Sequence, residues 1–301
     1  MKPKNFEKKR LQKHYDFWKI EEYHRTRKRN GVKMDSYARS ELEVGRKKGI
    51  SGSTIKMIAI ISMLIDHIGA AVVGRLIQEQ GFAASDMQLM MTGQLPDAEM
   101  KLFMLYWVMR MIGRLGFPIF CFLLIEGFEH TRNVTKYALR LFAFALISEI
   151  PFDLAFSGKF FYKEYQNVFF TLLIGLLVMM VFRQIENSEK FNAFLKVLFR
   201  IAVLVLGMVL AEFMKTDYSW IGVLCIACLY LTRKNKAQQI ITGCIAFSWE
   251  LTAPLAFIPI GFYNGKRGWN IKYFFYIFYP AHLLILYLIV YAMGMGGLPS
   301  M

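Results

Sequence analysis

Cysteine and proline are scarce in this chain of 301 residues, which holds 4 Cys and 8 Pro. The four cysteines lie inside apolar blocks, which argues against a disulfide framework and against an exposed redox centre. Cys225 and Cys228 share one helical face, but no second pair completes a metal site, so we expect no bound metal. No short apolar segment with a cleavage site precedes the first long apolar block, so we expect no cleavable signal peptide.

Charge is scarce beyond the first 49 residues. The chain has a formal net charge of +15, and residues 1–49 hold 16 Lys and Arg against 7 Asp and Glu, a balance of 16 − 7 = +9. The basic run around Arg25 to Arg29 could bind nucleic acid, but beside a membrane it favours anionic lipid on the cytoplasmic side. We therefore expect residues 1–53 to form a basic cytoplasmic tail that binds anionic lipid and no nucleic acid, and residues 54–301 to form a membrane domain.

Hydrophobic residues make up 55% of the chain and come in long blocks. A helix that crosses a hydrocarbon core of about 30 Å needs roughly 20 apolar residues. The sequence thus predicts an all-α, polytopic transmembrane helix bundle of about 8 to 10 helices, some broken or re-entrant, in the plasma membrane. The expected spans are residues 55–77, 102–128, 137–157, 168–183, 196–214, 218–232, 239–262 and 273–293.

The loops predict which ends of these spans lie in the cytoplasm. The basic tail places the N-terminus inside, and the loop 78–101, which is mainly acidic, then lies outside. Simple alternation would also place the basic segment 263–268 outside, against the positive-inside tendency. Pro254 and Pro259 interrupt the preceding apolar block, so we favour a re-entrant or broken helix that returns to the inner side.

Asp66 and His67 lie in the first span, about 12 residues or roughly 18 Å from its inner end. A charged side chain at this depth costs on the order of 2.5 to 3.5 kcal/mol, so it needs a partner, a wet cavity or a chemical role. A histidine in an apolar span is often only a helix contact. Beside a carboxylate, a catalytic role is as plausible as that structural one.

Arg110 and Arg114 share a face of the second span, and the segment 116–118, Gly-Phe-Pro, can break the helix below them. Two cations on one face suggest an anionic ligand, because a guanidinium donates two parallel hydrogen bonds to a phosphate or carboxylate. The alternative is internal ion pairing, for which Glu126, Glu149 and Asp153 are the candidate partners.

Several further polar residues lie in or beside apolar blocks. Glu149 and Asp153, four residues apart, could share a proton, bind a cation or clamp an arginine, and the last is favoured. Glu126 and His130 share the same spacing at the expected inner rim. Asn167 is interpreted as a helix cap or a substrate contact, with capping favoured.

An ordered series of short segments resembles the TraX family of membrane proteins. These are LIDHIG at 64–69, RMIGRLGFPIF at 110–120, EGFEHTRN at 126–133, ALISEIPFD at 145–153, QNVFFT at 166–171, YNGKRG at 263–268 and YPAHL at 279–283. The resemblance covers about residues 53–291. Founding members of that family are associated with N-terminal acetylation of conjugative pilin, and TraX resembles a wider superfamily of membrane acyltransferases.

The resemblance implies an integral membrane acetyltransferase that moves an acetyl group from cytoplasmic acetyl-CoA to an amine or hydroxyl acceptor, such as a pilin N-terminus or an envelope glycan. In several relatives a basic residue, ten intervening residues and a histidine mark the active site. Lys56 and His67 have that spacing here, with lysine in place of arginine. The alternative class is a proton- or ion-coupled transporter that uses the same buried charges.

The implied catalytic residues are His67, as base or acetylated nucleophile, and Asp66, as the group that orients its ring or balances its charge. Arg132, Lys136, Arg140, Lys266 and Arg267 are the candidates for the CoA phosphates. The full set expected to bind substrate or CoA is Lys56, Arg110, Arg114, Glu126, His130, Arg132, Glu149, Asp153, Asn167, Asn264, Lys266, Arg267 and His282.

Overall fold

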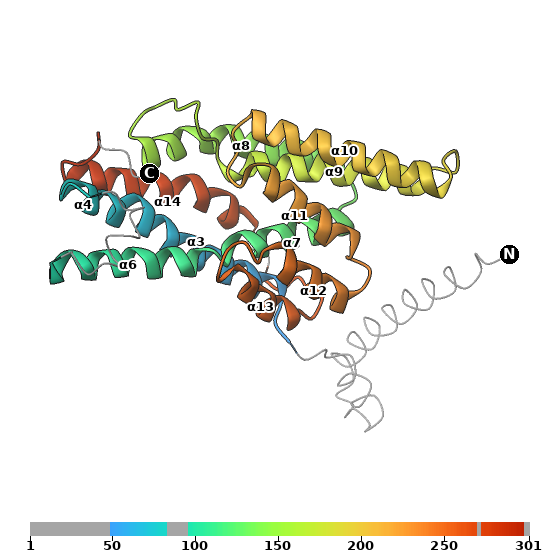
Figure 1. Ribbon diagram of the computed structural model, residues 1–301, viewed down its shortest axis with the longest axis horizontal. Coiled ribbons are helices and arrows are strands. Elements are labelled where there is room, and N and C mark those ends of the chain that lie inside the picture. The colour runs from blue at the N-terminus through green and yellow to red at the C-terminus, as the bar shows by residue number, and fades with distance from the viewer. Residues whose placement is uncertain (1–48, 83–95, 270–271, 298–301) are drawn as a thin grey trace, which may run out of the picture. The chain divides into compact units, whose positions relative to one another are not determined.

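The computed structural model describes residues 49–82, 96–269 and 272–297. The chain divides into two compact units, Met1–Lys48 and Gly49–Met301, and all described residues belong to the second. Their regular structure is helical, with two isolated β-bridges and no sheet (Figure 1). The expected all-α helix bundle is confirmed. The expected basic tail, residues 1–53, lies almost wholly outside the described residues.

The first span is one rod of three segments: α3 (Gly52–Ile68), the π-helical segment η1 (Gly69–Val73) and α4 (Gly74–Glu79). Ser51 caps α3, since its side-chain oxygen accepts a hydrogen bond from the backbone N–H of Thr54. The π segment begins two residues after His67. A π-bulge inside an α-helix is frequently found at a functional site, so this irregularity marks the same region as the polar pair.

The second span breaks in the middle, as expected, into α6 (Asp97–Gly113) and α7 (Gly116–His130). A helix end at this depth leaves carbonyl groups that no water can satisfy. Two hydroxyls replace the missing partners: Thr252 Oγ1 donates to the Met111 carbonyl at 2.6 Å, and Ser62 Oγ donates to the Ile112 carbonyl. The break is therefore a built feature that turns Arg110 and Arg114 toward neighbouring helices.

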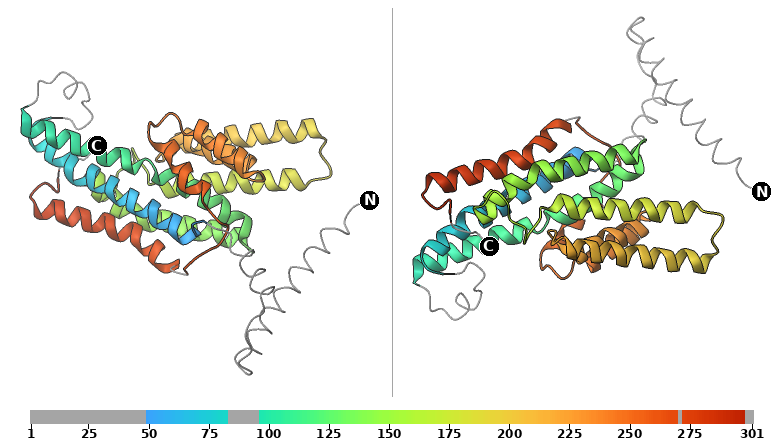
Figure 2. Two further views of the ribbon diagram at one scale, coloured as in Figure 1. Left: turned by 90° about the horizontal axis from the view of Figure 1, so that it is seen from below. Right: turned by 90° about the horizontal axis from the view of Figure 1, so that it is seen from above.

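Four helices follow: α8 (Val134–Ser157), α9 (Val168–Asn187), α10 (Ala193–Phe213) and α11 (Ser219–Leu231). Figures 1 and 2 show α9 and α10 side by side as a hairpin. Asn167 caps α9, as expected, by accepting a hydrogen bond from Phe169 N. Among its residues α10 buries only Gly207 and Ala211, so an apolar face of this helix is free to contact lipid.

The block expected as a crossing at 239–262 is a re-entrant hairpin. It consists of α12 (Lys236–Ala246), the 3₁₀ segment η2 (Ala253–Ala256) and α13 (Phe257–Gly261). At about 1.5 Å per residue, α12 is only about 16 Å long, which is too short to cross. Lys236 Nζ donates to the Tyr263 carbonyl at 2.8 Å, so the chain enters and leaves at one end. The two ends of the block therefore lie together, which fits the broken or re-entrant helix favoured from the sequence better than a plain crossing.

The last helix, α14 (Lys272–Ala292), packs mainly along α8, with smaller contacts to η1 and α3 (Figure 2). Within the described ranges, four helical stretches are long and apolar enough to cross a membrane by length and composition: Gly52–Glu79, Asp97–His130, Val168–Asn187 and Ala193–Phe213. Asp66 and His67 lie near the middle of the rod formed by α3, η1 and α4. Arg110 and Arg114 lie near the middle of the stretch formed by α6 and α7.

The basic loops gather at the end of the bundle where α3 begins, which we call the Ser51 end. The segment 262–269 runs beside the start of α3: Ile50 N donates to Phe262 O at 2.9 Å and Gly52 N donates to Lys266 O at 2.8 Å. Salt bridges from Arg233 to Glu129, at 3.2 Å, and to Glu186, at 3.0 Å, join the ends of α7, α9 and α11. The loops 131–133, 188–192, 232–235 and 262–269 thus share one end.

Candidate active site

The central polar cluster lies where α3, the α6–α7 break, the loop 214–218 and the turn 247–252 meet. Arg110 contacts Asp66 through NH1 and Oδ2 at 2.7 Å, with each side chain 16% exposed. Arg114 contacts Glu250 at 2.9 Å. Each arginine therefore has a carboxylate partner. The internal ion pairs that the sequence left open are present, but with Asp66 and Glu250 instead of Glu126, Glu149 or Asp153.

A third carboxylate, Asp217, lies within electrostatic range of Asp66 and of both arginines. Tyr165 Oη donates to Asp217 Oδ1 at 2.6 Å. Burial raises the pKa of the Asp217 carboxyl to about 6, because the charged form is poorly solvated in the loop between α10 and α11. Three carboxyl groups thus lie together with two guanidinium groups in this cluster.

His67 points about 100° around α3 from Asp66, because an α-helix has 3.6 residues per turn. His67 Nδ1 and His282 Nε2 of α14 lie 2.7 Å apart, with the two ring planes 6° from parallel. The ring is also in edge contact with Phe156 and Tyr279, at centroid distances of 5.3 and 6.0 Å. The expectation that Asp66 orients this ring is therefore corrected: His282 does so.

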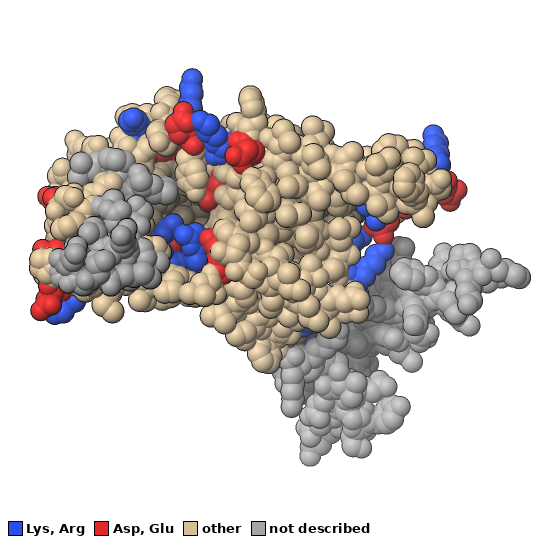
Figure 3. Space-filling model, viewed as in Figure 1, with Lys and Arg blue, Asp and Glu red and all other residues tan. Residues whose placement is uncertain are grey.

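The two halves of the site remain within reach of each other. Arg110, although paired with Asp66, lies within electrostatic range of the His67 ring and of Tyr165. On the face drawn in Figure 3, basic and acidic side chains meet in a hollow between largely uncharged surfaces. An imidazole, a guanidinium and a phenol thus border one polar region at the middle of the first span.

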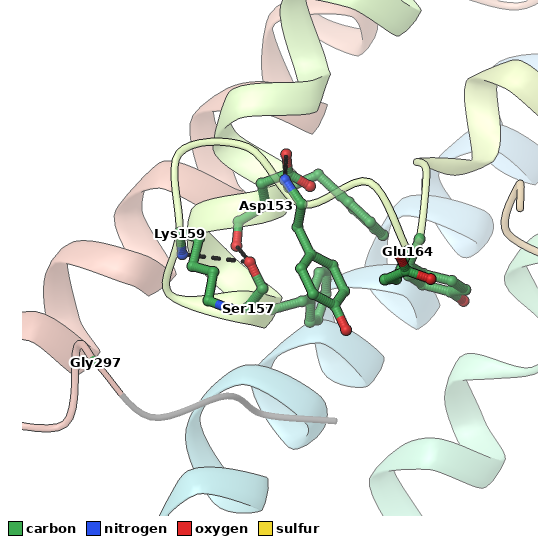
Figure 4. A pocket seen from close by; sticks show the side chains of 9 residues that line it. Asp153, Ser157, Lys159, Glu164 and Gly297 are labelled. Atoms are coloured by element: carbon green, nitrogen blue, oxygen red, sulfur yellow. Dashed lines mark hydrogen bonds between the residues drawn. The ribbon is translucent and has the colours of Figure 1, made fainter. Parts of the chain in front are cut away.

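A pocket of about 520 Å³ adjoins this region. Its walls come from the end of α8 and the loop after it, with Gly297 nearby (Figure 4). Phe156 and Tyr165 line it, and these are the same two side chains that contact His67 and Asp217. Asp153, 3% exposed, presents one oxygen to Tyr162 N at 2.8 Å, while its Oδ1 has no hydrogen-bond partner among the described residues.

Residues 51–290 match the family described as TraX protein. The chain belongs to the TraX family. The TraX match begins at the cap of α3 and ends within α14, so it contains every member of the central cluster and leaves the basic tail outside.

One curated relative of this TraX member is "Probable fimbrial assembly protein FimC, serogroup H1" of Dichelobacter nodosus. It is 29% identical over 273 residues, which cover 81% of this chain and 97% of the relative. No solved structure matches this chain. Family membership and the apolar helices together describe a membrane protein.

Other expected site residues of this TraX chain lie near the cluster without joining it. Glu149 Oε2 accepts hydrogen bonds from the backbone and side-chain amides of Asn167, whose Nδ2 also donates to the Ala145 carbonyl at 2.8 Å. Neither Glu149 nor Asp153 clamps an arginine among the described ion pairs, so that interpretation is wrong. Tyr279 lies within electrostatic range of Glu149 and contacts His67, so it lies between these two side chains.

A second group of expected residues lies at the Ser51 end, away from His67. Lys56 is eleven residues from His67 on the same face of α3, or about 16 Å along the axis. Asn264 Nδ2 donates to Gly49 O at 3.0 Å, and the exposed side chains of Lys266 and Arg267 follow it. Also at this end lie Glu126, His130, Arg132, Lys136 and Arg140. The expected site residues thus fall in two regions, which α3 joins.

Sequence reasoning missed Glu250, Asp217 and Tyr165. Glu250 is the one charged residue of the block 239–262, and its isolation there was a usable signal. Asp217 and Tyr165 gave no such sequence signal, because they lie in segments with the composition of ordinary polar loops. Tyr218, the next residue, has a left-handed backbone with φ of 63° and stacks on Phe117 at 3.7 Å, so this loop is held in a costly conformation beside the cluster.

Proposed function

We propose that this TraX family member is a multi-pass acetyltransferase of the cell membrane, which moves an acetyl group from acetyl-CoA to an amine or hydroxyl acceptor. One observation carries the proposal: the imidazole of His67 lies within electrostatic range of Arg110, which pairs with Asp66, and contacts Phe156, which lines a pocket large enough for part of an acceptor. A general base, a cation and a binding pocket around one point are the parts that acyl transfer needs.

His67 Nε2 is the reacting atom in this proposal. Among the described residues no hydrogen bond to it is found, whereas Nδ1 is occupied by His282. As the acceptor attacks the thioester carbonyl carbon, Nε2 takes its proton, a C–N or C–O bond forms and the C–S bond breaks. The CoA thiolate then recovers the proton from the imidazolium and leaves as the thiol. In the alternative two-step route, Nε2 attacks the thioester carbonyl carbon and the C–S bond breaks. The acetyl group then passes from Nε2 to the acceptor.

Arg110 supplies stabilisation of the negative charge that develops on the thioester oxygen. A guanidinium has five N–H donors, and NH1 alone is used in the contact with Asp66. Because Asp66 holds the guanidinium in place, its charge is already oriented when the reaction begins. Preorganised donors of this kind are worth about 3 to 4 kcal/mol in acyl transfer.

The pocket beside Phe156 is the proposed acceptor site. The unpartnered Oδ1 of Asp153 suits a protonated amine or a hydroxyl donor, and the aromatic side chains of Phe156, Tyr162 and Tyr165 suit an apolar or ring-bearing body. The fimbrial relative makes a peptide amine of a fimbrial subunit the first acceptor to test. An envelope glycan is the second.

The Ser51 end is the proposed entrance for acetyl-CoA, on the cytoplasmic side. Basic loops gather there, and Lys266 and Arg267 are exposed on the segment beside the start of α3. The basic tail supports a cytoplasmic N-terminus, and the tail is proposed to bind anionic lipid. Lys56 lies between this entrance and His67 on one face of α3, where it is proposed to contact the thioester arm of acetyl-CoA.

The direct test uses the full chain purified in lipid nanodiscs, with radiolabelled acetyl-CoA and a fimbrial-subunit peptide. We expect label on the peptide amine and release of free CoA thiol, and we expect His67→Gln to lower the rate by at least about 100-fold. Lys190→Gln is the control, since the Lys190 side chain is exposed in the loop between α9 and α10 and belongs to none of the expected site residues. Full activity of His67→Gln would remove His67 from the chemistry.

A proton- or ion-coupled transporter is the second candidate, favoured by the three carboxylates Asp66, Asp217 and Glu250 around two arginines. This function predicts substrate flux in proteoliposomes that does not depend on acetyl-CoA. Release of CoA thiol without flux supports the transferase, and flux without CoA release supports the transporter.

A further inference from the structure

Two hydrogen bonds in series lead from the backbone of α14 to the ring of His67. His282 Nδ1 lies 2.7 Å from the carbonyl oxygen of Phe278, and His282 Nε2 lies 2.7 Å from His67 Nδ1. His282 is 5% exposed, and burial disfavours a charge on either ring, so both are taken as neutral imidazoles. A neutral imidazole has one N–H donor and one acceptor nitrogen.

The direction of both bonds follows from the carbonyl. A carbonyl oxygen can only accept, so the proton of His282 must lie on Nδ1. His282 Nε2 is then a lone-pair acceptor, and the proton shared with His67 must belong to His67 Nδ1. Because a neutral ring carries one such proton, His67 Nε2 is left unprotonated.

We propose that His282 is a positioning residue, which fixes His67 in the tautomer that carries its proton on Nδ1 and thereby keeps the Nε2 lone pair free. The catalytic consequence rests on the acetyltransferase proposed above, because it is Nε2 that would receive the acceptor's proton. The tautomer itself is a property of the resting protein and can be measured without any substrate.

The surroundings hold both rings in this arrangement. Phe278 stacks on His282 with ring centroids 4.7 Å apart, and Phe156 and Tyr279 pack edge-on against His67. Free histidine prefers the tautomer protonated on Nε2, so an acceptor at Nδ1 is needed to reverse the preference. The same contact also stabilises the imidazolium that forms when Nε2 takes a proton, since Nδ1–H still donates to His282.

The decisive measurement is ¹⁵N NMR of the histidine rings in the full chain in nanodiscs, with His67→Gln used to assign the His67 signals. Wild type is expected to show a protonated Nδ1 and an unprotonated Nε2 at neutral pH. A ring protonated on Nε2, or on both nitrogens, overturns the proposal whatever the enzyme assay shows. An inactive protein with the expected spectrum would sink the proposed function and leave the positioning role standing.

Two variants of one position then separate positioning from packing. His282→Leu removes the acceptor and keeps much of the bulk, so His67 is expected to change to the tautomer protonated on Nε2 and kcat to fall by about 100-fold or more with KM nearly unchanged. His282→Gln offers an amide oxygen to Nδ1 and is expected to keep the wild-type tautomer and most of kcat. If both variants lose kcat equally while both keep the wild-type spectrum, His282 is a packing residue and the proposal is wrong.

Discussion

The carboxylate of Asp66 fills the space that a side chain on residue 113 would need. A Cβ atom built on Gly113 would overlap the Asp66 carboxyl group, so the close approach of α3 and α6 depends on the absence of a side chain there. This contact places Asp66 Oδ2 against Arg110, one turn before Gly113 on the same helix. The glycine is thus part of the site although it carries no chemistry.

Gly113→Ala is expected to force Asp66 away from Arg110 and to lower the free energy of unfolding by about 1 to 3 kcal/mol, the usual cost of overpacking. Thermal unfolding of the variant in nanodiscs measures this. Gly261→Ala is the control, because the added methyl would find only ordinary contact with Ile240 at 3.7 Å. Equal stability of the two variants would contradict the packing described for Asp66.

The sequence predicted the helices well because long apolar blocks have few alternative structures in a membrane. It also predicted the break before Gly116 and the return of the chain at 254–263, since proline, glycine and a basic loop give local signals. The depth of Asp66 and His67 followed from counting residues along one helix. Each of these features is decided within a single segment.

The partners of the buried charges could not be predicted, because pairing depends on how separate helices pack. Arg114 pairs with Glu250, 136 residues further along the chain, and His67 with His282, 215 residues further. The isolation of Glu250 in its apolar block shows that it needs a partner, but no local pattern identifies that partner as Arg114. The expectation that Asp66 orients the His67 ring was an avoidable error, because neighbouring residues in a helix point about 100° apart.

The Arg110–Asp66 pair is expected to couple energetically. Asp66→Asn leaves a guanidinium without its partner and should cost about 3 kcal/mol, while Arg110→Gln in the same chain should recover part of that loss. A double-mutant cycle on unfolding free energies gives the coupling. Simple addition of the two single effects would show that the pair contributes nothing of its own.

Asp153→Asn is expected to raise KM for an amine acceptor by roughly 10- to 100-fold with little effect on kcat, since it removes a charge-assisted hydrogen bond worth about 1.5 to 3 kcal/mol. Steady-state kinetics with peptide as the varied substrate measures this. Glu164→Gln makes the same change of charge in the same pocket, but Glu164 is 61% exposed and bound to Lys215. We expect that control to behave as wild type, and a similar KM increase in it would point to bulk charge instead of a specific contact.

Lys266→Ala is expected to raise KM for acetyl-CoA several-fold, roughly 1 kcal/mol, and to make it less sensitive to salt, because an exposed lysine acts on phosphates mainly through its charge. Kinetics at two salt concentrations provide the measurement. Lys190→Ala removes an equally exposed charge from the loop between α9 and α10 at the Ser51 end and should leave KM unchanged. Equal effects of both substitutions would argue against a defined CoA entrance beside the start of α3.

The re-entrant hairpin makes a topological prediction that a plain crossing does not. The hydrogen bond from Lys236 to Tyr263 brings both ends of 236–263 to the Ser51 end, so a cysteine at Lys266 should face the same side of the membrane as one at Lys234. Phe161, 75% exposed in the loop after α8, lies some 36 Å away by the length of that helix and should face the other side.

Single cysteines at these three positions, in a chain whose four native cysteines are replaced by alanine, can be labelled in intact cells with a membrane-impermeant maleimide. Labelling at 161 alone before permeabilisation, and at 234 and 266 only afterwards, is the expected result. If 266 were labelled together with 161, the hairpin would have to cross the membrane, and Lys266 could not reach acetyl-CoA in the cytoplasm.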